Sequence, residues 1–195
     1  MAVIVKLGGS LAGAGTLEAW LAAIVATGGG RCIVVPGGGD FAEAVRIAQR
    51  RLGFSDRTAH LMALLAMEQY ALLLAERAPA LRLCDDEAEI AAALAAGGIA
   101  LWRPRRMVEA DPAIAASWDV TSDSLAAWLA PRVGATRLVL VKSAPAPEAA
   151  PSPERLAALG LVDPAFPAYA ARAGIPVAYC GPSEVARLAE EIGLG

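Results

Sequence analysis

The sequence predicts an α/β fold built on a parallel sheet. Two apolar segments, residues 2–5 and 32–35, are rich in β-branched side chains, as buried strands are. Each is followed at once by a glycine-containing turn and then by a segment whose apolar residues have helical spacing. Strand, glycine turn and helix therefore occur twice within the first 52 residues. This repetition is typical of parallel sheets, whose ligand-binding loops follow the carboxyl ends of the strands.

The composition is that of a folded chain, and it limits the classes of partner that the protein can bind. Of the 195 residues, 56% are hydrophobic and 19% are charged, which excludes a disordered chain and suffices for one domain over residues 1–195. The formal charge of −3 and the few aromatic side chains provide no surface for nucleic acid. Cys32, Cys84 and Cys180 lie far apart in apolar segments, so we expect buried thiols in a reducing compartment.

No segment of the sequence predicts membrane insertion or secretion. The first residues, MAVIVKLGG, lack the long apolar region and cleavage site of a signal peptide. The longest apolar segment, residues 61–75, is shorter than a bilayer span and is interrupted by Glu68 and Gln69. We therefore expect a cytoplasmic protein with no membrane partner.

The first two helices are defined by their end signals. Residues 16–27 form a helix that Thr16 is expected to cap and that the glycines at 28–30 end. Residues 41–52 form the next helix, after the turn Pro36-Gly37-Gly38-Gly39-Asp40. The apolar residues on one side of this second helix are Phe41, Val45, Ala48 and Leu52.

The remaining elements continue the alternation of strands and helices. Ser55 and Asp56 cap a long helix that extends to about Arg77. Two segments, residues 103–112 and 144–153, are expected to be loops, because prolines interrupt them and their apolar residues follow neither the helical nor the strand period. The other predicted elements are, in order, strand 81–84, helix 85–96, strand 99–102, a helix through 125–129, strand 137–141, helices 154–159 and 163–173, strand 176–180, and a last helix after residues 181–183.

Four polar segments are expected to meet at one edge of the sheet. Residues 6–10, 37–40 and 142–143 each follow a strand, and residues 119–124 open a helix. The loops after parallel strands gather at one edge, so these groups converge although they are distant in sequence. Two lysines and two glycine turns suit a polyphosphate, and the carboxylates suit Mg²⁺ or the ordering of an ammonium group. Together they predict phosphoryl transfer, which requires positioning and charge neutralisation.

Other nucleotide motifs match less well. A Walker A loop requires Gly-Lys-Ser or Gly-Lys-Thr, and the sequence contains neither tripeptide. Gly37, Gly39 and Ala42 meet part of a dinucleotide-binding fingerprint, but a convincing acidic residue at the end of a following strand is lacking, because Asp56 lies in an expected helix cap. A dehydrogenase remains an alternative, and it predicts NAD binding without affinity for ATP.

Two further comparisons narrow the class. VIVKLGGSL followed by VVPGGGDFA resembles the amino acid kinase superfamily, which implies a carbamate kinase-like three-layer α/β/α sandwich with a mainly parallel central sheet. FSDRTAHLMALLAMEQYALLLA, SWDVTSDSLAAWLA, LVLVKS and GLVDPAFPAY resemble the branch that includes (5-(aminomethyl)furan-3-yl)methyl phosphate kinase of methanofuran biosynthesis. The resemblance implies ATP and Mg²⁺ as cofactors and a small phosphate or carboxylate as the acceptor of the γ-phosphoryl group.

The resemblance also assigns roles to residues. It implies that Lys6 neutralises the transferring phosphoryl group, that Asp123 orients the lysines and that Lys142 binds nucleotide phosphates. Mg²⁺ is expected on ATP, with Asp119 or Asp123 as candidate protein ligands. The residues expected to bind ATP are Gly8, Gly9, Ser10, Lys142 and Ser143. The residues expected to bind the acceptor are Gly37, Gly38, Gly39, Asp40, Arg57, His60, Asp119 and Thr121.

Simpler explanations stay open at several of these positions. Asp119 and Asp123 could simply be helix-capping residues without a functional role, and Lys142 could be a solvated lysine at the end of a strand. His60 could be an ordinary polar residue on a helix, but Arg57 lies on the same face and the two could grip an acceptor phosphate. For Arg46 and Arg50 a solvated helix face is the expectation, and the tryptophans Trp20, Trp102, Trp118 and Trp128 are expected in the core or an interface.

One departure from the family pattern keeps a second function open. After Lys142 the chain reads Ser143-Ala144-Pro145-Ala146-Pro147, where many relatives have Asp-Gly followed by Val or Ile. This departure favours the alternative of a non-catalytic nucleotide- or oxyanion-binding protein on the same fold. Under either function, the apolar helices, above all residues 61–74, predict a homo-oligomer, although a core helix explains them equally well.

Overall fold

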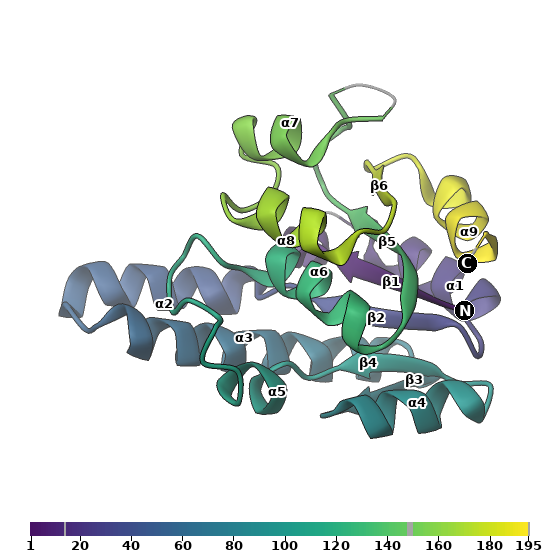
Figure 1. Cartoon of the computed structure of the whole chain (residues 1–195), viewed down its shortest axis with the longest axis horizontal. Coiled ribbons are helices and arrows are strands. Elements are labelled where there is room, and N and C mark those ends of the chain that lie inside the picture. Colours follow the sequence, from purple (N-terminus) through teal and green to yellow (C-terminus); the bar gives the residue numbers. More distant parts are fainter. Residues whose placement is uncertain (14, 148–149, 195) are drawn as a thin grey trace.

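The computed structural model describes residues 1–13, 15–147 and 150–194. Within these ranges, six strands form one parallel sheet in the order β3-β4-β2-β1-β5-β6, with helices on both faces (Figure 1). The predicted three-layer α/β fold with a parallel sheet is therefore confirmed. The strands are β1 (Ala2–Leu7), β2 (Cys32–Pro36), β3 (Leu81–Cys84), β4 (Ile99–Trp102), β5 (Ala135–Val141) and β6 (Val177–Cys180).

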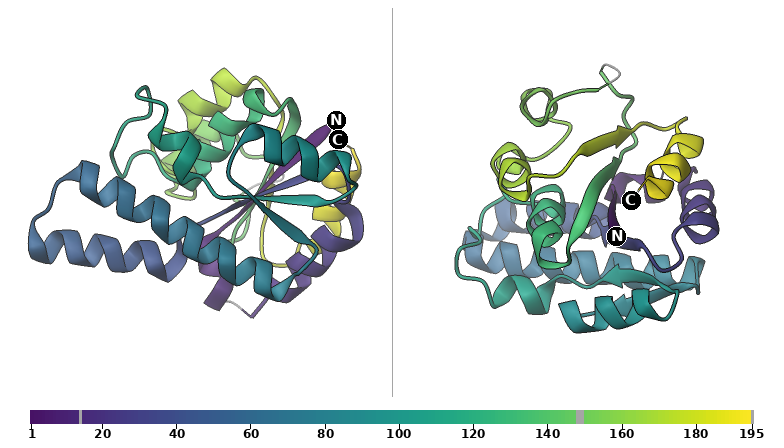
Figure 2. Two further views of the ribbon diagram at one scale, coloured as in Figure 1. Left: turned by 90° about the horizontal axis from the view of Figure 1, so that it is seen from below. Right: turned by 45° about the vertical axis from the view of Figure 1, so that its right-hand side comes forward.

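Two helical layers enclose the sheet. Apolar side chains of α1 and α9 pack on one face, and those of α6 and α8 pack on the other (Figure 2). The helices are η1 (Gly9–Gly13), α1 (Leu17–Thr27), α2 (Gly39–Leu52), α3 (Asp56–Arg77), α4 (Glu87–Ala95), α5 (Arg105–Glu109), α6 (Ser122–Arg132), α7 (Pro153–Ala158), α8 (Phe166–Ala173) and α9 (Val185–Gly193).

The alternation of side chains along the central strands decides which layer each one faces. On β1, Ile4 packs in the apolar cluster that contains α6 and α8, whereas Val5 packs in the cluster that contains α1 and α9. Lys6 lies two residues after Ile4 and therefore points toward the α6 layer. On β5, Leu140 packs with the α6 cluster, and Lys142 follows it by two residues. Both lysines thus face the same layer.

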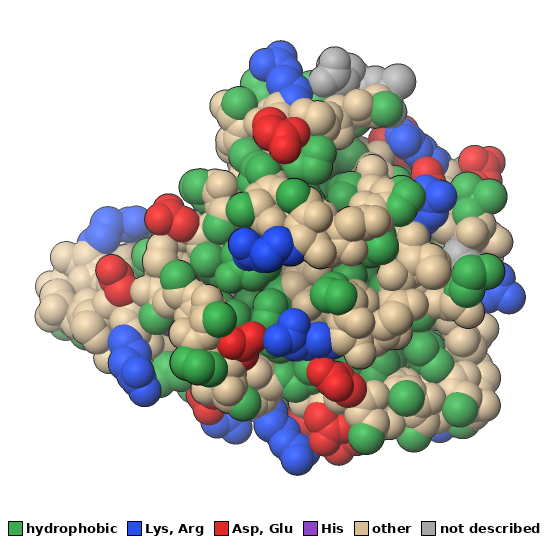
Figure 3. Space-filling view, viewed as in Figure 1, with side chains coloured by type: hydrophobic (Ala, Val, Ile, Leu, Met, Phe, Trp, Pro, Cys, Tyr) green, Lys and Arg blue, Asp and Glu red, His purple; other side chains and the backbone are tan. Residues whose placement is uncertain are grey.

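Helices α2 and α3 form a hairpin that extends beyond the sheet (Figure 1). Because α2 packs mainly along α3, Val45 is the residue of its apolar side that is buried. On the same side, Phe41 and Leu52 are 40% and 66% exposed, and Ala48 is half-buried. On the face shown in Figure 3, acidic and basic side chains are interspersed, both on this hairpin and on the body of the molecule.

Helix α3 is, by length and composition alone, long and apolar enough to cross a membrane. Its 22 residues extend beyond the apolar segment 61–75, which by itself is too short to span a bilayer. In the fold, Tyr70, Ala71 and Leu74 of this helix are buried in the apolar cluster that contains α1 and α9. A core helix passes the same test, so this single helix is weak evidence for a membrane span.

Three local predictions need correction. Residues 103–112 contain the helix α5, in which Arg105 forms an i,i+4 ion pair with Glu109. Arg105 also forms an ion pair with Glu68 of α3, which no local pattern reveals. Thr16 precedes α1, but its side chain makes no capping hydrogen bond. Of the expected loop 144–153, residues 148–149 lie outside the described residues, and α7 already begins at position 153.

Candidate active site

Lys6, Asp123 and Lys142 form one buried ion-pair cluster at the carboxyl ends of β1 and β5. Lys6 Nζ lies 2.7 Å from Asp123 Oδ1, and Lys142 Nζ donates a hydrogen bond to Asp123 Oδ2 at 2.7 Å. The side chains of Lys6, Lys142 and Asp123 are only 4%, 13% and 6% exposed. These are the two lysines of the sequence, so both of its lysine side chains meet on one carboxylate.

The fold explains this convergence. Strands β1 and β5 are neighbours, and Lys6 is paired with Leu140. Lys142 therefore lies one pleat, about 6–7 Å, further along the adjacent strand on the same face. Asp123 occupies the first turn of α6, where the helix dipole favours a negative charge. Two strand ends and one helix start thus supply the three charges.

Burial and the neighbouring charges shift the pKa values of Asp123 and Lys142. Burial by itself would raise the pKa of Asp123, but Lys6 and Lys142 outweigh it and hold this pKa below its ordinary value. For Lys142, burial and the neighbouring Lys6 charge lower the pKa from 10.5 to about 8, and Asp123 opposes the decrease. With both lysines protonated, the cluster carries one surplus positive charge in a place sheltered from water. Such a site attracts an anion.

The glycine turns after β1 and β2 pack directly against each other. A Cβ atom on Gly9 would lie 2.0 Å from the backbone nitrogen of Gly39, and one on Gly37 would lie 2.4 Å from the nitrogen of Gly9. Gly39 also has a φ of +52°, in the left-handed region that favours glycine. The contact between the turns therefore explains these glycines without any ligand.

The backbone N–H groups of Gly8, expected to bind ATP, and of Gly37, expected to bind the acceptor, already have partners in the fold. The N–H of Gly8 donates to the carbonyl of Val141 at 2.9 Å, and the N–H of Gly37 donates to the carbonyl of Leu7 at 2.8 Å. The expectation that Gly8 contributes its N–H to a phosphate cradle is therefore incompatible with this geometry. The first N–H groups of α2 and α6, as at any helix start, lack intrahelical acceptors.

The two loops expected on the nucleotide side touch each other. Ser10 Oγ and Ser143 Oγ are 2.8 Å apart and exposed, so a hydrogen bond joins the turn after β1 to the segment after β5. This bond places both hydroxyls at the rim of the site, next to Lys142.

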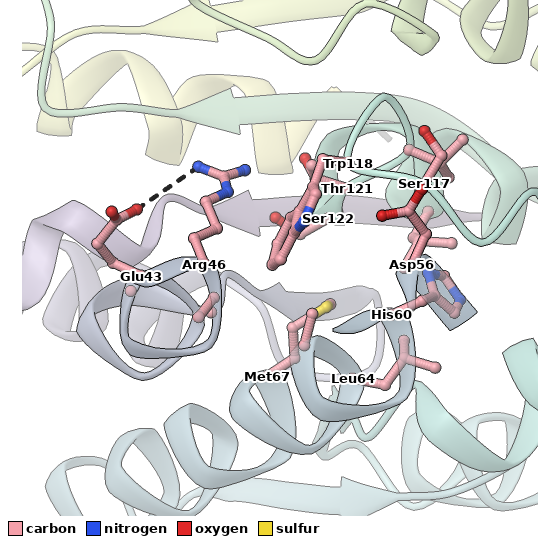
Figure 4. A pocket seen from close by; sticks show the side chains of 16 residues that line it. Glu43, Arg46, Asp56, His60, Leu64, Met67, Ser117, Trp118, Thr121 and Ser122 are labelled. Atoms are coloured by element: carbon pink, nitrogen blue, oxygen red, sulfur yellow. Dashed lines mark ion pairs between the residues drawn. The ribbon is translucent and has the colours of Figure 1, made fainter. Parts of the chain in front are cut away.

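A cavity of about 180 Å³ lies at the start of α6. It lies between α2, α3 and the segment that leads into α6 (Figure 4). Gly39 and Ser122 line it, and these residues respectively contact Gly9 and precede Asp123 in the chain. The other polar side chains that line it are Glu43, Arg46, Asp56, His60, Ser117 and Thr121. The cavity therefore reaches the residue that precedes Asp123, whereas Lys6, Asp123 and Lys142 themselves are not among the residues that line it.

Arg46 and Trp118 form one wall of this cavity. The Arg46 guanidinium carbon lies 4.4 Å from the centre of the Trp118 ring, which is a cation–π arrangement. The Trp118 Nε1–H donates to Gln49 Oε1 at 2.7 Å and fixes the ring against α2. A solvated face was expected for Arg46, and a core or interface position was expected for Trp118. Both side chains line the cavity instead.

The other residues expected to bind the acceptor are placed unevenly. His60 lines the cavity, and burial lowers its pKa while Glu109 opposes the decrease. Arg57, which was expected to act with His60, is exposed and is not among the residues that line the cavity. Asp40 and Asp119 are also exposed and outside the lining. The structure thus brings His60 but not Arg57 to this site.

Asp163 was missed by the sequence interpretation. Its carboxylate is buried and accepts hydrogen bonds from the backbone and the hydroxyl of both Thr121 and Ser124. Thr121 was expected to bind the acceptor, but its hydroxyl donates a hydrogen bond to Asp163 instead. The segment GLVDPAFPAY marked this region only by resemblance, because no local pattern links Asp163 to the start of α6.

The charges of the site fit a polyphosphate better than a bare metal ion. Among the described residues, no group of three or more His, Cys, Asp or Glu side chains is placed to hold a metal. Asp123, a candidate ligand of Mg²⁺, has a lysine on each oxygen. The residues that would hold ATP phosphates are Lys6 and Lys142, and bound Mg²⁺ would supply further charge neutralisation.

The fold is shared with solved nucleotide kinases. Uridylate kinase from Archaeoglobus fulgidus superposes with a TM-score of 0.70 at 19% identity, over 97% of this chain and 96% of its own. UMP kinase from Bacillus anthracis gives 0.71 at 14% identity, over 100% and 92%. UMP kinase from Ureaplasma parvum gives 0.70 at 14% identity, over 97% and 92%. At these identities the likeness establishes the fold. No curated protein sequence matches the chain significantly.

The family follows from the sequence match. The model of the amino acid kinase family matches residues 1–146, three quarters of the chain. The chain therefore belongs to the amino acid kinase family, and with it to the phosphotransferases.

Proposed function

We propose that the protein transfers the γ-phosphoryl group of ATP to an anionic oxygen of a small acceptor held in the cavity beside Asp123. The observation that carries this proposal is the pair Lys6 and Lys142 on one buried carboxylate, with a cavity lined by the two residues that precede Asp123 in the chain. Phosphoryl transfer requires positive charge at fixed positions around the transferring group. Two ammonium groups held by one carboxylate meet that requirement.

The residues divide the work between them. Lys6 and Lys142 offset the charge that develops as the acceptor oxygen bonds to the γ-phosphorus and the bond to the bridging oxygen of ADP breaks. Asp123 holds the two ammonium groups in place, which reduces the reorganisation needed during the reaction. A phosphate or carboxylate acceptor is already ionised at neutral pH. The reaction then needs no general base, which fits a site whose lysines are both paired with a carboxylate.

The lining of the cavity supports an acceptor with an anionic group. Arg46 lies at the wall, and its ion pair with Glu43 is long at 3.7 Å, so its guanidinium remains open to a second anion. The Trp118 ring offers a flat apolar surface next to it. Glu43 and Asp56 also line the cavity and would pair with an amine on the same molecule. An aminomethylfuran phosphate of methanofuran-type biosynthesis combines these features and is our first candidate. UMP, named by the structural neighbours, is the second.

A binding protein without catalysis is the competing function. The segment Ser143-Ala144-Pro145-Ala146-Pro147 favours it, because it replaces the turn that many kinases of the family have after this lysine. In that case the paired lysines would hold a nucleotide or another oxyanion without transfer.

One experiment separates the two functions. The protein is incubated with γ-labelled ATP, Mg²⁺ and, in turn, the aminomethylfuran phosphate, UMP and a carboxylate acceptor. We expect acceptor-dependent ADP release and a labelled product whose mass is one phosphoryl group above the acceptor. Arg46→Ala should raise the KM for the acceptor, while Arg51→Ala, on an exposed position of the same helix, should not. Stoichiometric ATP binding without turnover of any acceptor would contradict the proposal.

A further inference from the structure

The amino-terminal end of α6 is held by a remote side chain instead of its own cap. Thr121 occupies the N-cap position, but its hydroxyl makes no capping bond within the helix. In an ordinary cap, this hydroxyl would accept from the N–H three residues later, which here belongs to Ser124. That N–H instead donates to Asp163 Oδ2 at 3.0 Å. The carboxylate of Asp163 therefore replaces the local cap.

Four donors converge on this one carboxylate. Asp163 Oδ2 accepts from the Thr121 N–H at 3.0 Å, from the Thr121 hydroxyl at 2.8 Å and from the Ser124 N–H. Asp163 Oδ1 accepts from the Ser124 hydroxyl. Asp163 and Ser124 are 7% and 0% exposed, so water does not compete strongly for these bonds. The first turn of α6 is thereby fixed to the segment between α7 and α8.

Asp123 lies between the two residues that Asp163 holds. Thr121 and Ser124 flank it in the sequence, and their four bonds fix the backbone from which its side chain extends. Because Asp163 accepts the donors of the helix end, both oxygens of Asp123 stay available to Lys6 and Lys142. Two carboxylates at one helix start therefore have separate tasks.

We infer that Asp163 is a positioning residue for phosphoryl transfer: it fixes the start of α6 so that Asp123 can hold Lys6 and Lys142 together. The inference rests on the proposed function only where it says that the lysines serve phosphoryl transfer. The arrangement of the two lysines itself can be measured without substrate. Asp163 also lies beyond Lys142 in the chain, on the segment that follows the loop after β5. Asp163 thus links that segment to the residues on either side of Asp123.

The test uses the presence of only two lysines in the sequence. Protein labelled with carbon-13 at the lysine ε-position gives one NMR signal for each, and the chemical shift is followed against pH. The charged groups that act on Lys142 are Lys6 and Asp123. In the parent, we expect the Lys142 signal to titrate near 8. A Lys142→Arg sample assigns the signals.

Asp163→Asn should move the Lys142 midpoint downward by roughly one pH unit, because burial and Lys6 remain while Asp123 is displaced. Asp123→Asn gives the largest decrease and calibrates the scale. Asp111→Asn is the matched control, because Asp111 accepts bonds from Trp128 and Arg132 near the other end of α6. It should leave the midpoint unchanged.

A folded Asp163→Asn protein whose two lysine midpoints equal those of the parent would overturn the inference, whatever its melting temperature. If that variant does not fold, Ser124→Ala decides, since it removes only the hydroxyl bond to Asp163 Oδ1. A smaller downward shift supports the inference, and an unchanged midpoint overturns it. Failure of the kinase assay with every acceptor would leave these midpoints untouched, so the two proposals fail separately.

Discussion

At the scale of single residues, Asp123 matters because it holds two ammonium groups at once. A buried carboxylate with one partner would be neutral overall, whereas this cluster keeps one surplus positive charge. The surplus is what an incoming phosphate meets. Removing either lysine leaves a neutral pair, and removing Asp123 leaves two like charges that repel.

Lys6→Ala should therefore lower kcat by roughly a hundredfold or more, which is the scale for losing one group that stabilises the transition state. The measurement is ADP release with the best acceptor at saturating ATP. Circular dichroism checks that the variant is folded, because its substitution empties a position that is 4% exposed. A folded variant that turns over as fast as the parent would show that Lys6 has no role in transfer.

Lys142 predicts a pH dependence with a definite sign. Its pKa is lowered to about 8, so the ammonium form is lost as pH rises through that value, and kcat/KM should fall there. The contribution of Lys142 to the free energy of unfolding should change in the opposite direction and increase with pH. Between about 8 and 10.5 the unfolded chain binds more protons at this lysine than the folded chain, so the free energy of unfolding gains from this group as pH rises. Activity that falls in step with unfolding would contradict this explanation.

Residues near strand ends could be predicted from sequence, and residues that act across the fold could not. Lys6 and Lys142 follow apolar strands directly, and the side-chain period of a strand fixes the face to which they point. Asp163 holds donors 39 and 42 residues earlier in the chain, and its short segment carries no periodic signal. Arg46 was placed in solvent because the sequence shows its helix but not the tryptophan that packs over it.

At the scale of elements, the two glycine turns act as one unit. Their backbones approach so closely that side chains at Gly9 or Gly37 have no room. This contact fixes the end of β1 against the start of α2, and thus fixes Lys6 relative to the cavity. Glycine-rich turns that look like phosphate loops in sequence have here a packing reason as well.

Gly9→Ala should separate the turns and lower the free energy of unfolding by about 1–3 kcal/mol, the usual range for overpacking. Its measure is urea denaturation of the variant beside Gly13→Ala. A Cβ at Gly13 meets nothing within 4 Å, so that control should unfold close to the parent. Equal denaturation midpoints for Gly9→Ala and the parent would mean that the turns are not in contact.

Helix positions show where the periodic signal stops being informative. The spacing in residues 41–52 correctly indicates a helix but not how much of its apolar side is buried, and Phe41 and Leu52 on that side are exposed. The helix α5 was missed because its residues Arg105 and Arg106 form ion pairs with other elements. In both segments, tertiary partners decide what the local pattern leaves open.

At the scale of the whole molecule, the parallel sheet gathers the site from strands that are distant in sequence. Neighbours β2, β1 and β5 end at one edge, and α6 begins there. The alternation of strands and helices was sufficient to predict this architecture. The order of the strands had to come from the structure, because crossover connections do not reveal it.

The α2–α3 hairpin supports the expectation of a homo-oligomer, and we propose it as the contact between copies. It extends from the body of the molecule (Figure 1; Figure 2). It also exposes large apolar side chains, which contacts between copies of a chain commonly bury. These side chains are Phe41, Ile47, Leu52, Leu65 and Leu72. Light scattering should give a multiple of the chain mass, and Leu65→Arg with Leu72→Arg should reduce it to one chain. A parent protein with the mass of one chain would refute the proposal.

The central claim is that both lysines meet the phosphoryl group that is transferred. Its most direct measurement is an NMR titration of lysine-labelled protein with Mg²⁺ and a non-hydrolysable ATP analogue. The account predicts that both lysine signals move and saturate together, at the affinity that calorimetry gives for the analogue. Binding by calorimetry while both lysine signals stay in place would contradict it.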